Sequence, residues 1–94
     1  MTNFENLSQY VDNHIDSMNH SVDWAREKMQ NDSRSFRLNW VCDAIEIDEA
    51  KMQGAVAFAQ IYGKLITKDE AESLRERIHK AWCDARDRAF NEIV

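Results

Sequence analysis

Apolar residues recur every three or four positions over most of the chain, which is the spacing that places them on one face of an α-helix. The first series begins just after Thr2 and Glu5, whose types and spacing fit a helix capping box. Its members are Phe4, Leu7, Val11, Ile15, Met18, Val22, Ala25 and Met29. This pattern predicts a helix over about residues 4–30, ended by the polar turn residues 31–33.

The next stretch also has helical spacing, but it carries two apolar faces. The first face consists of Val41, Ala44, Ile45, Met52, Ala55, Val56, Ala59 and Tyr62. The second consists of Trp40, Ile47, Gly54, Phe58, Ile61 and Leu65. A helix that is apolar on two sides has to be covered on two sides. We therefore expect a central helix over about residues 34–63, flanked by the other helices or by another subunit, with Gly54 allowing a neighbour to approach closely.

A third helix is predicted over about residues 68–91. Gly63 is a candidate C-cap for the preceding helix, and Thr67 with Glu70 forms a second capping box. The apolar face that follows consists of Ala71, Leu74, Ile78, Ala81, Trp82, Ala85 and Ala89. Because the connections are short, neighbouring helices should run antiparallel. The predicted fold is all-α, an antiparallel three-helix up-down-up bundle that forms a single domain over residues 1–94.

Composition narrows the alternatives to this fold. The 94 residues include no proline and only two glycines, whereas a sandwich or barrel needs frequent turns built on those residues. The net charge of −5 has the wrong sign for direct binding to nucleic acid. The longest small-apolar run, residues 54–59, is far too short to span a bilayer.

Neither a basic segment nor an apolar segment of the kind found in signal peptides is visible at the N-terminus, so we expect a cytoplasmic protein. In that compartment we expect Cys42 and Cys83 to be reduced thiols packed against neighbouring side chains. One disulfide between them is the alternative.

The predicted topology gathers aromatic and basic residues at one end of the bundle. Residues from the end of the first helix, the start of the second and the end of the third meet there. Among them are Trp24, Trp40, Trp82, Phe36, Phe90, Arg26, Lys28, Arg34, Arg37, Arg86 and Arg88. Aromatic and arginine side chains are enriched in the energetic centres of protein interfaces.

The candidate partner-binding residues are therefore Trp24, Phe36, Arg34 and Arg37, with Asp43 and Glu46 as an acidic patch beside them. Two other interpretations stay open. The aromatic side chains could cap the core beside solvated arginines, or the start of the second helix could bind a phosphorylated ligand.

Catalytic chemistry finds little support in the sequence. The three histidines lack metal-ligand spacing, and no phosphate-binding glycine loop or nucleophile elbow occurs. Residues 46–49 and 84–87 resemble the paired acidic motifs of all-α nucleotide pyrophosphohydrolases, which hold Mg²⁺. The second motif lacks its glutamate, however, and bundles of that family use more helices. We therefore expect no enzyme, no metal and no cofactor.

The predicted function is a small non-enzymatic inhibitor or interaction module that occupies a surface on a larger protein. In general character it is similar to inhibitors encoded by phages and mobile elements, including anti-CRISPR proteins, which is an analogy rather than a derivation. One alternative is a sponge or sensor for a nucleotide or another phosphorylated ligand. The other is a self-assembling helical adaptor that forms a homodimer through the second helix.

Overall fold

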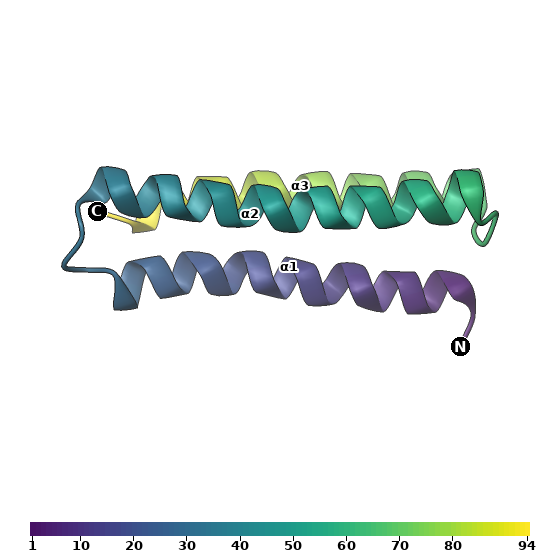
Figure 1. Cartoon of the computed structure of the whole chain (residues 1–94), viewed down its shortest axis with the longest axis horizontal. Helices are drawn as coiled ribbons and strands as arrows, with labels where there is room; N and C mark the ends of the chain where they lie inside the picture. The colour runs from purple at the N-terminus through teal and green to yellow at the C-terminus, as the bar shows by residue number, and fades with distance from the viewer.

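The computed structural model describes all 94 residues and contains three long helices and no strand. Helix α1 spans Asn3–Lys28, α2 spans Arg34–Ala57 and α3 spans Lys68–Glu92. A single π-helical turn, η1 (Phe58–Tyr62), continues α2. The helices run up, down and up, and Figure 1 shows them side by side along the full length of a molecule that measures 47 × 19 × 17 Å. The predicted three-helix bundle is confirmed.

Each α-helix begins at a side-chain cap that the sequence contains. The backbone N–H of Glu5 donates to Thr2 Oγ1 at 3.1 Å, and that of Glu70 donates to Thr67 Oγ1 at 3.1 Å. Ser33 accepts in the same way from the N–H of Phe36 at 3.1 Å. Both predicted capping boxes are present. These caps satisfy N–H groups that have no partner within the helix, so they set where each helix starts.

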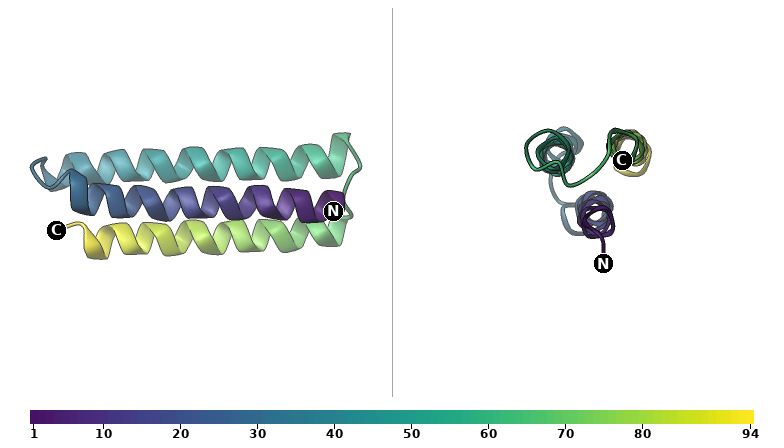
Figure 2. Two further views of the ribbon diagram at one scale, coloured as in Figure 1. Left: turned by 90° about the horizontal axis from the view of Figure 1, so that it is seen from below. Right: turned by 90° about the vertical axis from the view of Figure 1, so that its right-hand side faces the viewer.

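One core runs along the axis of the bundle, where the three helices form the corners of a triangle (Figure 2). It contains seventeen buried side chains. They are Val11, Met18, Val22, Ala25, Leu38, Val41, Ile45, Met52, Val56, Ala59, Ile66, Ala71, Leu74, Ile78, Ala85, Ala89 and Ile93. Phe4, Leu7, Ile15, Met29 and Trp82 pack against them while partly buried. The apolar faces predicted for the first and third helices are therefore the ones that pack together.

The end of the second helix differs from the prediction. The chain leaves α-helical geometry after Ala57, and the π turn closes with the N–H of Gly63 donating to Phe58 O at 2.8 Å. A π turn takes more residues than an α turn. It therefore turns Tyr62, which was assigned to the buried face, out into solvent at 78% exposure.

Gly63 is the C-cap of η1, as the sequence predicted for the end of this helix, but it does not have the left-handed conformation that is common at C-caps. Its φ is −81°, and the residue with positive φ is Lys64, at 50°. Gly63 is nevertheless in a tight place, because a Cβ there would lie 3.1 Å from Leu65 Cγ. The left-handed step falls one residue later because the π turn uses Gly63 to complete its own hydrogen bond.

Helix α2 is continuous through Gly54, but no other helix of the chain approaches that residue. A Cβ built on Gly54 would have no neighbouring atom within 4 Å. The close approach predicted for this position is therefore absent within the molecule. None of the three helices has the length and apolar character needed to cross a membrane.

Candidate interaction surface

The predicted aromatic and basic end of the bundle exists. The end of α1, the start of α2 and the end of α3 lie together at the end of the molecule marked by the C-terminus (Figure 1). Two of the six candidate residues, however, are committed to contacts inside the chain. Arg34 Nε donates to Ile93 O at 2.9 Å, and its Nη2 donates to Phe90 O at 3.2 Å.

Arg37 is buried, with 7% of its surface exposed, and its Nη2 donates to Val94 O. The carbonyls at the end of a helix have no partner within the helix, so cationic donors there are stabilising. Arg34 and Arg37 thus fasten the end of α3 to the start of α2. Arg34 and Arg37 were also predicted to contact a partner, and any such contact would have to use side chains that already have this structural role.

The remaining four candidates are exposed, and they lie on two different helices. Trp24 is 45% exposed on α1, with its ring 6.3 Å from that of His20. Phe36, Asp43 and Glu46 are exposed on α2. The structure therefore brings Arg34 and Arg37 together at the end of α3, and it places Phe36 and the two acidic residues along one side of α2.

Half of the exposed large apolar side chains of the molecule lie along that side of α2 and its continuation. We define the outer face as seven positions at helical spacing along α2, η1 and the following loop. They are Phe36, Trp40, Ile47, Gly54, Phe58, Ile61 and Leu65. The core residues of α2, such as Val41, Ile45 and Met52, alternate with these positions in helical phase and point the opposite way.

Burial values separate the two faces sharply. Ile45 is fully buried, whereas Ile47 is 56% exposed and Phe58 is 62% exposed. Helices α1 and α3 both pack on the core side of α2 and leave the outer face uncovered. Sequence reasoning found this second apolar face, but it selected only Phe36 of the seven as a site residue. Exposure in the folded chain, rather than periodicity, distinguishes it from a core face.

Asp48 lies close in sequence to the acidic residues Asp43 and Glu46, but it faces α1 and is only 7% exposed. Its Oδ2 accepts from Ser17 Oγ at 2.9 Å, and its Oδ1 lies 2.8 Å from His14 Nδ1. In a catalytic triad the histidine stands between the serine and the carboxylate. Here the carboxylate stands between the other two, so the cluster ties α1 to α2 and contains no serine–histidine pair.

A second contact involves the cysteines, which are both free. Cys83 Sγ lies 3.6 Å from His79 Nε2, one helical turn away on α3. This places a base beside a thiol, which the sequence alone had not indicated. The molecule contains no pocket at this pair or elsewhere, and no three potential metal ligands gather at one place.

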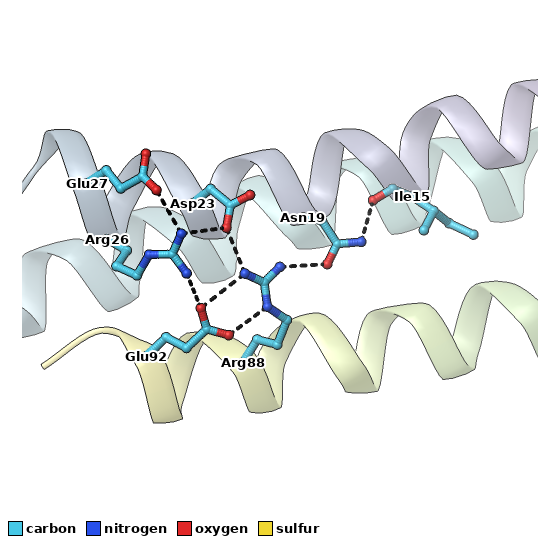
Figure 3. A network of polar contacts seen from close by, with 7 residues as sticks. All are labelled: Ile15, Asn19, Asp23, Arg26, Glu27, Arg88 and Glu92. Atoms are coloured by element: carbon cyan, nitrogen blue, oxygen red, sulfur yellow. Dashed lines mark hydrogen bonds and ion pairs between the residues drawn. The ribbon is translucent and has the colours of Figure 1, made fainter.

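Polar contacts between α1 and α3 form an ion-pair seam, which consists of Asn19, Asp23, Arg26, Arg88 and Glu92 (Figure 3). Arg88 Nη2 lies 2.7 Å from Asp23 Oδ1, and Arg88 Nε lies 2.7 Å from Glu92 Oε2. Arg26 contacts both Asp23 and Glu92. The hydrogen bond from Arg88, followed by the nearby charges, lowers the pKa of Glu92 below 4.5. The hydrogen bonds to Glu92 and Asp23 raise the pKa of Arg88.

Comparison with protein-family models, with curated proteins and with solved structures finds no match to this chain.

Proposed function

We propose that this chain is a non-enzymatic protein-interaction module that docks another protein chain through the outer face of α2. The observation that carries the proposal is the exposed apolar stripe itself. It runs along α2 and the turn that follows, and it includes Phe36, Ile47, Phe58 and Ile61, each more than half exposed. Exposed apolar surface gathered on one side of a protein marks interaction sites.

The way the stripe is supported suits it to docking. Its side chains stand on a helix whose opposite side is packed into the core, so the backbone that carries them is fixed before a partner arrives. A rigid surface loses little conformational entropy when it binds. Aromatic residues, here Phe36, Trp40 and Phe58, are enriched at the energetic centres of interfaces.

The larger target protein and the inhibitory role stay predictions from the sequence. The contact residues predicted for them are Trp24, Phe36, Arg34, Arg37, Asp43 and Glu46. The alternative of a nucleotide or another phosphorylated ligand relies on the start of α2, where Arg34 and Arg37 lie. Both of these guanidinium groups already donate to the carbonyls at the end of α3. That alternative also stays a prediction, and no contact in the structure favours it.

Chemical cross-linking of the tagged chain in the cells that express it tests the proposal. We expect cross-linked species above the mass of the single chain, and we expect the double variant Ile47→Glu, Phe58→Glu to lose them. Both side chains lie outside the core, so the variant should keep its helical circular-dichroism spectrum. Phe90→Glu, at an exposed apolar position on α3, is the matched control and should keep the species. Absence of any such species in the wild type, or their persistence in the double variant, contradicts the proposal.

A further inference from the structure

The outer face has a symmetry of its own, which points to the identity of its occupant. We infer that the occupant is a second copy of this chain, packed antiparallel across a two-fold axis that passes Gly54. This inference rests on the proposed function, because it names the partner of the same docking surface. A two-fold interface is isologous: the same patch is used on both copies and must be complementary to itself.

The spacing of the side chains meets that requirement. Ile47 and Ile61 lie at equal distances along the sequence on either side of Gly54, and both are more than half exposed. In an antiparallel pair centred on Gly54, Ile47 of each copy falls opposite Ile61 of the other. Ala50 falls opposite Phe58, so a small side chain meets a large one. Ridges of one helix can then enter the grooves of its neighbour.

The presence of glycine at position 54 also supports a helix crossing at this point. Glycine in a helix interior costs about 1 kcal/mol relative to alanine. Nothing within the chain explains its presence, since a Cβ there would meet no atom within 4 Å. At the centre of a helix crossing, glycine would instead let a second backbone come close, and the neighbouring Ala50 and Ala57 would widen the contact.

Charge fixes the direction of the pair. Between Trp40 and Ala50, α2 carries Asp43, Glu46 and Glu49 outside the core and no basic residue. From residue 51 to residue 68 the chain carries Lys51, Lys64 and Lys68 and no acidic residue. An antiparallel pair places Asp43 of one copy next to Lys64 of the other, at both ends of the interface. A parallel pair would place like charges together, which opposes association.

The area that this register can cover is sufficient for a specific interface. Phe58 is 62% exposed, Ile47 is 56% exposed and Leu65 is 50% exposed. With aromatic side chains of about 150–250 Å² and somewhat smaller aliphatic ones, the side chains of Ile47, Phe58, Ile61, Tyr62 and Leu65 expose roughly 550 Å² per copy. Covering both copies would bury roughly 1,100 Å², which is above the roughly 1,000 Å² that a specific protein interface needs.

Light scattering on the purified chain, over about 1–100 µM, tests the inference. We expect a mass of twice the 11.0 kDa chain at the upper concentrations. Gly54→Leu should remain monomeric or dissociate at least tenfold more readily, because the new side chain fills the crossing point while it has free space in the single chain. Asn91→Leu, an exposed polar position on α3, is the control and should dimerise like the wild type.

Disulfide trapping then tests the direction. In a background with Cys42→Ala and Cys83→Ala, we expect chains with Ile47→Cys to form a disulfide with chains that carry Ile61→Cys. Neither variant should cross-link efficiently with itself. Pairs of 47 with 47 and of 61 with 61 would show a parallel arrangement and overturn the antiparallel one.

The outcomes separate this inference from the proposed function. The wild type could be a monomer at every concentration while its cellular cross-links to other proteins still require the outer face. That result would overturn the inference of a second copy and leave the proposed function standing. A monomer without any outer-face cross-link overturns both. A dimer that Gly54→Leu leaves unchanged overturns the placement of the axis.

Discussion

The ion-pair seam between α1 and α3 and the outer face of α2 are both surfaces of one bundle, yet they are built from opposite residue types. At the seam, Arg88 finds Asp23 and Glu92 within 2.7 Å, so its charges are matched inside the chain. On the outer face, Ile47 and Phe58 remain more than half exposed, and neither α1 nor α3 covers them. The comparison shows that the charges of the seam are paired within the chain, whereas the apolar side chains of the outer face stay exposed to solvent.

The sharpest way to break the comparison is to truncate the two faces of α2 separately. Ile45→Ala removes a fully buried side chain, and we expect it to lower the free energy of unfolding by about 2–5 kcal/mol. Ile47→Ala removes an exposed one, and the monomer should change by less than about 0.5 kcal/mol. Urea unfolding at dilute protein concentration measures both. Similar losses in the two variants would mean that the outer face is part of the core.

The seam is the next target. Arg88→Ala removes the hydrogen bonds to Asp23, Glu92 and Asn19 together, and charge-assisted bonds are the stronger kind. We expect a loss of about 1–2 kcal/mol in the free energy of unfolding, because the guanidinium is partly exposed and screened by water. Lys80→Ala is the control, since that side chain is 82% exposed and has one ion pair at 3.8 Å. It should cost almost nothing, and an equal loss in both variants would contradict a special role for the seam.

The sequence predicts the fold of this molecule better than it predicts the candidate site. The fold follows from periodicity and caps. Each stretch of apolar residues at helical spacing lies in a helix of the structure, and Thr2, Ser33 and Thr67 are the N-caps of the three helices. The π turn could not be predicted, because no residue between Ala57 and Gly63 is incompatible with an ordinary α-helix. Its effect is local: it exposes Tyr62 and moves the left-handed residue to Lys64.

The candidate site was harder to predict because residue type misled at two positions. Arginine and aspartate side chains usually lie at the surface, but Arg37 and Asp48 are both buried. Both fall in phase with the buried positions Val41, Ile45 and Met52, and that phase is the signal that could have placed them inside. Their burial depends on partners from other helices, Val94 O for Arg37 and Ser17 with His14 for Asp48, and a single sequence does not show these pairings.

A substitution at Lys64 tests the loop between the outer face and α3. The φ of Lys64 is 50°, a conformation that costs a residue with a side chain about 1–2 kcal/mol and costs glycine very little. Glycine at this position would therefore relieve that cost in the folded state, but its greater freedom in the unfolded chain offsets part of the stabilisation. We expect Lys64→Gly to raise the free energy of unfolding by about 0.5–1 kcal/mol. A matched Lys68→Gly variant, at the first helical position of α3, should lower it, and stabilisation by both would contradict the argument from φ.

The smallest expected effect is a pH dependence confined to the seam. The hydrogen bond from Arg88 holds the pKa of Glu92 below 4.5, so folding favours the carboxylate. A depressed pKa of this kind contributes stability that is fully present above the unfolded pKa and is lost as the pH falls through the folded pKa. Between about pH 4.5 and the lowered value, the melting temperature of the wild type should therefore fall more steeply than that of Glu92→Gln.

Because other carboxylates titrate in the same range in both proteins, the difference between the two melting curves isolates Glu92. Glu76→Gln, at an exposed position of α3 without an ion pair, is the matched control and should follow the wild type. No corresponding difference should arise from the outer face, since Ile47→Ala removes no titratable group. Parallel curves for the wild type and Glu92→Gln would mean that the Arg88–Glu92 pair contributes nothing to folding, and the seam would then be as dispensable to the single chain as the outer face.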